Sequence, residues 1–327
     1  MSKVLIVAEI GANHLGCYER AELLIREAKR AGADAVKFQT LVPCEIAADV
    51  LITVGPWAGM NYRDLYRECE MPWVWHDNLF HLVRSLGMIP FSAPFSEAAV
   101  KRLETIRCPM YKIASPEIVH HPLIAAAART GKPLVISTGM ATPHEIIQAK
   151  QVAQSNGATD ITFLHCVSNY PADPADYNLQ TLHWFEFAKL KFGLSDHTLG
   201  SLTAVMAIAL GATIIEKHFT LSRADGGPDA AFSLEPLEFY DLVKQCHSAE
   251  AAIAKDSFDR SDTASHEYRR SIWVVHDVEE GEVIQEHHLS ILRPDYGLEP
   301  RHWYNVIGKK ATRPLPSGSP LLWNDLI

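Results

Sequence analysis

Residues 4–39 contain the first complete structural unit and read VLIVAE, IGANHLGC, YERAELLIREAKRA, GAD and AVKFQ in succession. It opens with a short apolar run at 4–9, which predicts a buried strand. The next segment, 18–31, carries apolar side chains at the spacing of one helix face: Ala21, Leu24, Ile25 and Ala28. A second apolar run follows at 35–39. This order of strand, helix and strand is that of a βαβ unit.

The same alternation recurs along the first 250 residues, with eight strand candidates: 4–9, 35–39, 89–93, 110–113, 134–137, 161–165, 192–195 and 213–217. Helical segments separate them, among them 97–105 and 144–156. Eight such units predict an α/β fold, a closed (β/α)₈ TIM barrel. The connection 41–73 is unusually long, and long loops on a barrel are typically functional.

The alternation of apolar strand-like and helical segments stops after residue 254, which predicts a second domain. Residues 255–266 are polar and indicate a linker. A strand-like run at 271–275, a turn at Glu279–Glu282 and many prolines follow. We therefore expect a barrel at 1–254 and a small β-rich domain at 267–327. So short a domain has a thin core, which favours docking onto another surface.

Composition excludes several classes of protein. The formal net charge of −9 is unfavourable for nucleic-acid binding. The six cysteines are scattered without a C-x-x-C pair, which indicates reduced thiols in a cytoplasmic protein rather than disulfides or a thiolate zinc site. The longest apolar stretch, 204–215, contains Gly211 and is too short to span a membrane.

Polar side chains follow seven of the eight predicted strands. Active sites of these barrels lie at the C-terminal ends of the strands. Charged residues are rarely buried unless they are paired or functional. The pattern therefore favours a catalytic rim over simple packing. Its members are Glu9, Asn13, His14, Lys37, Gln39, Lys112, Ser115, Glu117, Ser137, His165, Asn169, Tyr170, Ser195, Asp196, His197, Glu216, Lys217 and His218.

Three lysines of this rim, Lys37, Lys112 and Lys217, are candidates for binding an anionic substrate. With Ser137 and Ser195 they can neutralise and hydrogen-bond a phosphate and a carboxylate. The alternative for each lysine is an ion pair with a nearby glutamate.

The histidines at the ends of strands seven and eight, His197 and His218, stand at equivalent heights on neighbouring strands. Two neutral imidazoles so placed can share one divalent cation and leave coordination positions open to water and substrate. The alternative is that each histidine is a plain hydrogen-bonding side chain.

At these residues the sequence resembles the sialic acid synthase family, in which a barrel precedes an antifreeze-like (SAF, β-clip) domain. The barrel motifs are AEIGANH (8–14), VKFQT (36–40), YKIAS (111–115), ISTGM (136–140), GLSDHT (193–198), EKHFT (216–220) and GPD (227–229). LRP (292–294) and IGKK (307–310) resemble the antifreeze-like domain. The motifs occur in the family's order along nearly the whole chain.

Three further segments are most similar to the pseudaminic acid synthases of this family: MPWVWH (71–76), DGGPDAAFSL (225–234) and RPDYGL (293–298). The opening EIG (9–11) and His165-Cys166 look more like the N-acetylneuraminate and legionaminate branches. The resemblance implies condensation of phosphoenolpyruvate with an N-acetylated amino-sugar aldehyde and release of phosphate. The implied acceptor is 2,4-diacetamido-2,4,6-trideoxy-altrose, with N-acetylneuraminate or legionaminate synthesis as the alternative.

The resemblance also implies residue roles. Those for phosphoenolpyruvate are Lys37, Lys112, Ser137, Asn169 and Ser195. His197 and His218 would hold Mn²⁺ or Mg²⁺, with Glu9 and Glu216 beside the reacting groups. Those for the sugar are Gln39, Tyr170, Asp229 and Arg293. Arg293 would come from the antifreeze-like domain of a partner subunit in a domain-swapped homodimer.

Two other functions are compatible with parts of this pattern. A Schiff-base aldolase on the same fold would use Lys112 or Lys217 as the nucleophile. A carbohydrate-binding protein without catalytic activity would release no phosphate from phosphoenolpyruvate. The polar rim is unfavourable for the second of these, because function is read from the site rather than from the fold.

Overall fold

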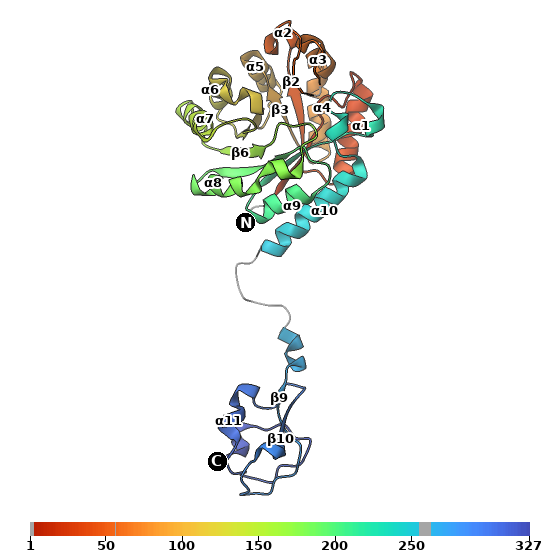
Figure 1. Ribbon diagram of the computed structural model, residues 1–327. Helices are drawn as coiled ribbons and strands as arrows, with labels where there is room; N and C mark the ends of the chain where they lie inside the picture. The colour runs from red at the N-terminus through yellow and green to blue at the C-terminus, as the bar shows by residue number, and fades with distance from the viewer. Residues whose placement is uncertain (1–2, 56, 255–262) are drawn as a thin grey trace. The chain divides into compact units, whose positions relative to one another are not determined.

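The computed structural model describes residues 3–55, 57–254 and 263–327. The chain divides into a barrel unit, Met1–Lys255, and a small unit, Asp256–Ile327. In the barrel unit eight parallel strands close in chain order (Figure 1). The strands are β1 (Leu5–Glu9), β2 (Ala35–Thr40), β3 (Ile89–Pro94), β4 (Tyr111–Ile113), β5 (Leu134–Ser137), β6 (Ile161–Cys166), β7 (Lys191–Asp196) and β8 (Ile214–His218). This confirms the predicted barrel, and every strand boundary agrees with its prediction to within one residue.

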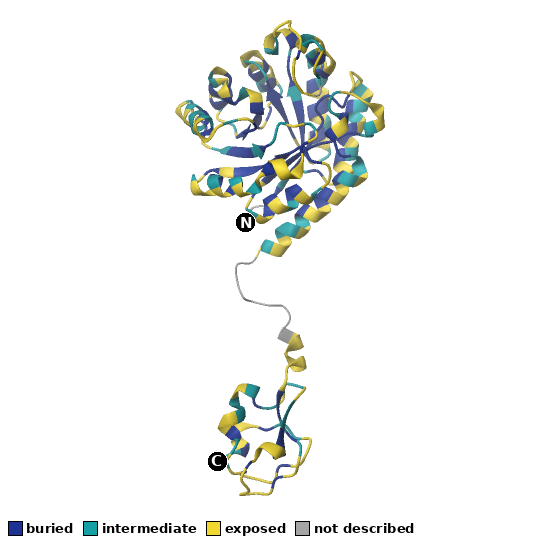
Figure 2. Ribbon diagram, viewed as in Figure 1, coloured by how far each residue is buried: buried dark blue, intermediate teal, exposed yellow. Residues whose placement is uncertain are grey.

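Helices surround the strands and bury their apolar faces against them (Figure 2). They are α1 (Tyr18–Arg30), α2 (Pro43–Ile46), α3 (Tyr62–Cys69), α4 (Trp73–Ser85), α5 (Glu97–Thr105), α6 (His121–Ala128), α7 (Pro143–Ser155), α8 (Leu182–Phe187), α9 (Leu202–Ala209) and α10 (Pro236–Ile253). Local sequence sets their starts. Helix α7, for example, begins with a capping box between Thr142 and Glu145. Among the described residues, no helix is both long and apolar enough to cross a membrane.

Strand register brings distant polar residues together at one end of the barrel. β1 pairs Glu9 with Lys37 of β2 on one side and with His218 of β8 on the other. β7 pairs Ser195 with Glu216 of β8. Because all strands are parallel, their C-terminal ends share one face, so residues more than 200 positions apart become neighbours.

The long connection 41–73 is an ordered structure. It contains α2 and α3, and an antiparallel bridge joins Leu51 to Asn61. Ile52, Leu65 and Cys69 form a small apolar cluster of their own with Leu41 and Ala12. This separate cluster holds the connection in place beside the C-terminal ends of the strands.

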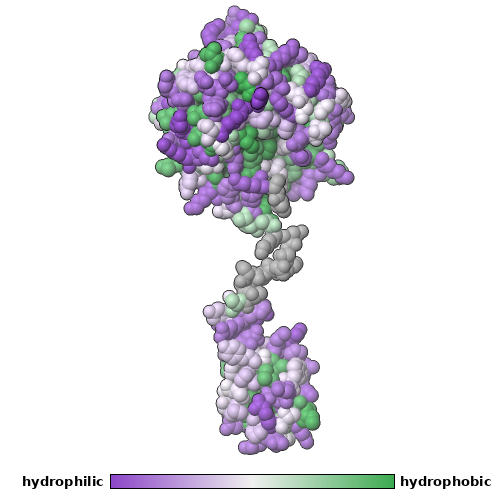
Figure 3. All heavy atoms as spheres, turned by 180° about the vertical axis from the view of Figure 1, so that it is seen from behind, coloured by the Kyte–Doolittle hydropathy of each residue, from purple (hydrophilic) through white to green (hydrophobic). Residues whose placement is uncertain are grey.

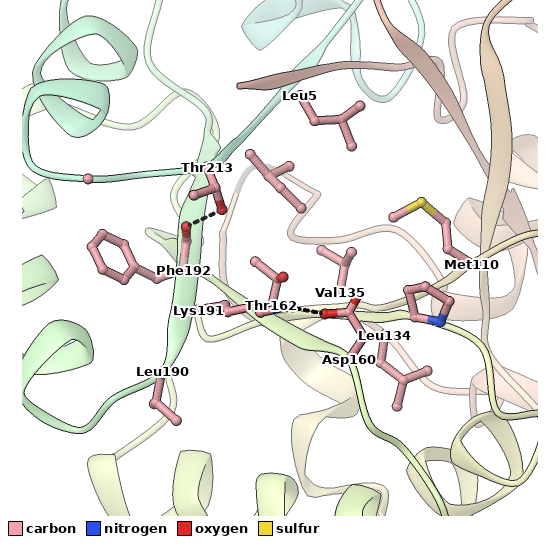
Figure 4. Close-up of a pocket in the computed structure, with 13 residues that line it drawn as sticks. Leu5, Met110, Leu134, Val135, Asp160, Thr162, Leu190, Lys191, Phe192 and Thr213 are labelled. Carbon is pink, nitrogen blue, oxygen red and sulfur yellow. Dashed lines mark hydrogen bonds and ion pairs between the residues drawn. The ribbon is translucent and has the colours of Figure 1, made fainter. Parts of the chain in front are cut away.

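A cavity of about 570 Å³ lies at the opposite, N-terminal end of the barrel (Figure 4). First residues of strands line it, including Leu5, Leu134 and Ile214. Most of the lining is apolar, and polar groups there are already paired: Lys191 with Asp160 at 2.7 Å, and the Thr213 hydroxyl with the Phe192 carbonyl at 3.0 Å. The cavity lacks the convergent polar groups of the other end, so we do not place the chemistry there.

The small unit contains β9 (Ser271–Val274), β10 (Leu289–Leu292) and the short helix α11 (Trp303–Val306). The two strands are antiparallel, and a core of ten buried apolar residues packs around them. Its surface mixes polar and apolar side chains (Figure 3). The predicted strand at 271–275 and the turn at Glu279–Glu282 are confirmed. Most of the predicted linker 255–266, namely 255–262, lies outside the described residues, so its extent stays a prediction.

Candidate active site

Two lysines and two glutamates from four strands meet at the C-terminal end of the barrel. Lys37 Nζ lies 2.8 Å from Glu9 Oε2 and 3.3 Å from Glu216 Oε1. Lys112 Nζ donates to the same oxygen of Glu216 at 3.2 Å. None of the four side chains is more than 5% exposed. Buried charges of this kind persist only when they are paired, and this cluster balances two formal positive charges with two negative ones.

The two lysines differ in their electrostatic surroundings. Burial alone would lower the pKa of Lys37, but the carboxylates of Glu216 and Glu9 raise it above its usual value. Burial lowers the pKa of Lys112, and Glu216 offsets only part of this effect. Burial would raise the pKa of Glu216, but Lys112 and Lys37 lower it to about 2. Lys112 is therefore the less compensated cation, and an incoming anion would stabilise its charge.

Hydroxyl groups border this cluster. Ser195 Oγ donates to Glu216 Oε1 at 3.2 Å. Ser137 and Ser168 each have a buried Oγ that has no hydrogen-bond partner among residues 3–55, 57–254 and 263–327. A side chain at Gly139 would not fit, because its Cβ would lie 2.3 Å from Ser168 Oγ. Buried polar atoms without partners call for a ligand or water.

The two predicted metal-binding histidines, His197 and His218, lie side by side, with ring centroids 5.5 Å apart. His197 Nδ1 is 2.8 Å from the Val167 carbonyl oxygen, so Nδ1 carries the hydrogen and Nε2 keeps a lone pair. Burial lowers the pKa of His197, which favours the neutral ring that a cation requires. These observations fit the donor set of a divalent cation.

Asp229 orients the second histidine. Its Oδ2 lies 3.5 Å from His218 Nδ1 and accepts the Ala12 backbone N–H at 2.8 Å. Burial would raise the pKa of Asp229, but His218 and that N–H lower it below its usual value. Within the described parts of the chain, no group of three or more His, Cys, Asp or Glu side chains is arranged to hold a metal ion. A cation bound here would therefore take its remaining ligands from water and substrate.

Three of the four residues predicted to bind the sugar border a cavity of about 390 Å³ at this end of the barrel. Gln39 lines it and donates to Glu9 Oε1 at 2.9 Å. Tyr170 also lines it, with its ring centroid 4.4 Å from that of His197. His218 and Asp229 complete the same wall. The cavity thus reaches His218 of the histidine pair and has the size of a small-molecule site, about 300–1,000 Å³.

One part of the predicted rim is wrong. Lys217 does not join Lys37 and Lys112, because it donates to Asp196 Oδ2 at 2.8 Å and to Thr198 and is fully buried. Side chains alternate between the two faces of a strand, so Lys217 faces the helices when Glu216 faces the barrel interior. His165 is likewise bound to the Tyr177 carbonyl, at 2.6 Å.

Two predicted site residues are not joined to the site by any contact among the described residues of the barrel unit. Asn169 follows β6, is exposed and donates to Asp176 at 3.2 Å. No contact in the described parts of the chain joins it to Lys37 or Lys112. Arg293 belongs to the small unit, where it is exposed directly after β10. Their proposed roles rest on the resemblance alone.

Sequence reasoning missed one wall of the cavity. Residues of the long connection form it: Ile52, Val54, Gly55, Trp57, Tyr62, Leu65, Tyr66 and Cys69. The only signal in the sequence was the length of the connection, since the residues themselves show no chemical motif.

The fold and this rim define a (β/α)₈ barrel with a buried lysine–glutamate cluster and a histidine pair at the C-terminal end of its strands. Residues 24–257 match the profile described as the NeuB family, and residues 269–327 match the SAF domain. The chain therefore belongs to the NeuB family.

Its relatives are similar over nearly their whole length. Pseudaminic acid synthase of Helicobacter pylori is 39% identical, covering 98% of this chain and 97% of its own. N,N'-diacetyllegionaminic acid synthase of Legionella pneumophila is 35% identical, covering 98% and 94%. The crystal structure of N-acetylneuraminic acid (sialic acid) synthetase from Leptospira borgpetersenii superposes with a TM-score of 0.74 at 30% identity, covering 82% of this chain and 92% of that one.

Proposed function

We propose that this protein is a nonulosonic acid synthase that condenses phosphoenolpyruvate with an open-chain N-acetylated amino-sugar aldehyde. The observation that carries the proposal is the buried Lys37–Glu216–Lys112 cluster beside the His197–His218 pair. Among possible acceptors we favour 2,4-diacetamido-2,4,6-trideoxy-altrose, the pseudaminic acid precursor. The 39% identity to a pseudaminic acid synthase supports this choice.

Phosphoenolpyruvate binds at the lysine cluster. Lys37 and Lys112 neutralise its phosphate and carboxylate, while Ser137 and Ser195 donate hydrogen bonds to their oxygens. Asn169 is assigned to the same substrate. The bound anion would give the Ser137 hydroxyl the hydrogen-bond partner that it lacks, and it would give the buried Lys112 a further negative charge to pair with.

The acceptor sugar occupies the neighbouring cavity. Gln39, Tyr170 and Asp229 contact it, and its aldehyde end lies at the histidine pair. His197 and His218 hold the divalent cation, Mn²⁺ or Mg²⁺, which supplies Lewis-acid polarisation of a carbonyl when bound. Tyr170 remains a neutral hydroxyl, because burial raises its pKa.

The reaction balances with water as the third reactant. C3 of phosphoenolpyruvate attacks the aldehyde carbon, and the carbonyl electron pair moves to the aldehyde oxygen, which takes up a proton. Water adds to the resulting cation at C2 and gives up a proton. The C–O bond to phosphate then breaks as the C2 hydroxyl gives its proton to the departing phosphate, leaving the keto acid and inorganic phosphate. Glu9 and Glu216 stand at the lysine cluster, where they hold and move these protons.

We further propose a domain-swapped homodimer in which Arg293 contacts the sugar bound in the partner subunit. A small domain with a core of ten buried apolar residues gains stability by docking. The exposed guanidinium of Arg293 suits a polar group on a ligand or a second subunit.

The experiment that tests the function is phosphate release from phosphoenolpyruvate with Mn²⁺ and three acceptors in parallel. These are 2,4-diacetamido-2,4,6-trideoxy-altrose, its mannose counterpart and N-acetylmannosamine. We expect the highest kcat/KM with the altrose sugar. A clear preference for one of the other two assigns legionaminate or N-acetylneuraminate synthesis instead. A covalent adduct trapped with borohydride and a keto acid would indicate a Schiff-base aldolase.

A further inference from the structure

His197 lies just beyond the end of its strand. The ladder between β7 and β8 ends with Asp196 opposite Lys217, and the ladder between β6 and β7 ends with Ser195 opposite Cys166. His197 follows the last paired residue of both ladders, so strand pairing does not fix its backbone. A residue that binds a metal ion must nevertheless be held in one orientation, and other groups have to provide this.

Three hydrogen bonds join His197 to the connection that follows β6. The backbone N–H of His197 donates to Tyr177 Oη at 2.8 Å. The N–H of Ala172 donates to the His197 carbonyl at 3.1 Å, and the Nδ1–H of the His197 ring donates to the Val167 carbonyl at 2.8 Å. The first two bonds hold the backbone of His197 and the third holds its ring. Together they fix the direction of the Nε2 lone pair.

The hydroxyl of Tyr177 contacts the end of β7 at two points. Besides accepting the His197 N–H, Oη donates to the Ser195 carbonyl at 3.0 Å. The side chain of Ser195 reaches Glu216, and the ring of His197 lies beside that of His218. One hydroxyl therefore joins the backbones of a proposed phosphoenolpyruvate ligand and a proposed metal ligand, at a place where β6 has already ended.

Tyr177 is itself firmly held. It is 0% exposed, and its carbonyl accepts the Nε2–H of His165 at 2.6 Å. The His165 ring packs edge-on against the Tyr177 ring, with centroids 5.9 Å apart, and against Phe185 of α8 at 6.3 Å. His165 of β6, Tyr177 and the end of β7 thus form one connected series of hydrogen bonds. The mechanism above gives neither His165 nor Tyr177 a role.

We propose that Tyr177, held by His165, is a positioning residue whose hydroxyl fixes the end of β7, so that Ser195 is placed for phosphoenolpyruvate and His197 for the divalent cation. This inference rests on the proposed function, from which it takes the two ligands. Without the hydroxyl, the buried N–H of His197 loses its partner and the residue can shift. Replacing a group that orients a metal ligand weakens metal binding by about 10–100-fold, so we expect a loss of this size for Mn²⁺ in Tyr177→Phe.

The first measurement needs no substrate. Apoprotein prepared with a chelator is titrated with Mn²⁺, and the electron paramagnetic resonance signal of free Mn²⁺ gives Kd. Tyr177→Phe removes one oxygen and keeps the ring. Tyr111→Phe is the matched control, because Tyr111 is equally buried and its hydroxyl donates to Glu104 of α5 instead. Both variants should lose stability, but only Tyr177→Phe should lose affinity for Mn²⁺.

The second measurement uses turnover. At saturating sugar, Tyr177→Phe should raise KM for phosphoenolpyruvate at least about threefold and change KM for the sugar little. Excess Mn²⁺ should restore most of kcat, because the metal ligand is displaced and not removed. A merely structural role of the hydroxyl predicts a lower Tm, with Kd for Mn²⁺ and both KM values as in wild type.

The outcomes separate this inference from the proposed function. A folded Tyr177→Phe variant with Kd for Mn²⁺ within about twofold of wild type refutes the inference and leaves the synthase intact. An unchanged KM for phosphoenolpyruvate refutes the part that concerns Ser195. If wild type releases no phosphate with any acceptor, the proposed function is wrong, whereas Kd for Mn²⁺ still decides whether Tyr177 positions His197. Absence of Mn²⁺ binding by wild type refutes the metal assignment and this inference with it.

A second variant covers the case in which Tyr177→Phe does not fold. His165→Leu removes the donor to the Tyr177 carbonyl and leaves the Tyr177 hydroxyl in place. We expect Mn²⁺ to bind at least about threefold more weakly to this variant. Wild-type affinity in folded His165→Leu would then overturn the inference.

Discussion

Replacing Lys112 by Met should weaken binding of phosphoenolpyruvate while the protein stays folded. Lys112 makes one ion pair, with Glu216 at 3.2 Å, whereas Lys37 keeps two carboxylate partners. The substitution preserves the aliphatic stem and leaves Glu216 paired with Lys37. The cluster of two lysines and two glutamates then changes from a formal charge of 0 to −1.

The magnitude follows from the contact that is lost. A charge-assisted hydrogen bond contributes about 1.5–3 kcal/mol, which corresponds to a rise of roughly ten- to 150-fold in KM for phosphoenolpyruvate. The excess negative charge favours the upper part of this range. KM for the sugar should change little, because the sugar cavity is not lined by Lys112.

Phosphate release at saturating sugar measures both constants, and Lys217→Met is the control. Lys217 is also a buried lysine at a strand end, but it is paired with Asp196 outside the barrel interior. Breaking that pair should cost about 3–5 kcal/mol of stability and leave KM for phosphoenolpyruvate unchanged. A folded Lys112→Met variant with a KM within twofold of wild type would refute the assignment.

Three other predictions concern the metal, Glu117 and the small domain. Removal of the metal by a chelator should abolish turnover, and added Mn²⁺ should restore it; full activity in excess chelator would contradict the metal assignment. His197→Ala and His218→Ala should each lower the metal content of the protein, measured by elemental analysis. Burial raises the pKa of Glu117 from 4.5 to about 7, so wild type should lose stability as pH rises through this window. At pH 8 the free energy of unfolding of Glu117→Gln should therefore exceed that of wild type by up to about 3 kcal/mol, whereas below pH 4.5 the two proteins should differ little. Thermal unfolding at both pH values measures this difference, and an equal difference at the two pH values would contradict the prediction. Mixing the inactive variants Arg293→Ala and Lys112→Ala after subunit exchange should restore activity, since mixed dimers contain one intact site; no recovery despite confirmed exchange excludes action in trans.

The fold was largely predictable because its signals are local. Each strand of the barrel is a short apolar run, and each helix carries its apolar residues at helical spacing, so both patterns can be read within a dozen residues. Their number and order then predict the closed barrel. The clustering of polar groups at one end of the barrel was also predictable, since parallel strands place all their C-terminal ends on one face.

Which of those groups meet was only partly predictable. The two-residue period of β8 places Glu216 and Lys217 on opposite faces, and applying it would have separated Lys217 from the other lysines. The pairing of Lys37 with both Glu9 and Glu216 needs closure of the barrel between β1 and β8. That contact joins opposite ends of the barrel sequence and leaves no local trace.

Local sequence patterns are sufficient to predict the barrel, the family motifs and the residue types at the rim, because hydrophobic period and motif residues are read over short distances along the chain. The tertiary structure was needed to show that Lys112 shares Glu216 with Lys37, that Lys217 faces outward, and that Trp57 lines the same cavity as His218 and Asp229. The physical reason is that burial, ion pairing and cavity shape depend on which side chains from distant segments share the same space, and the closure of the barrel and the folding of the long connection set that arrangement.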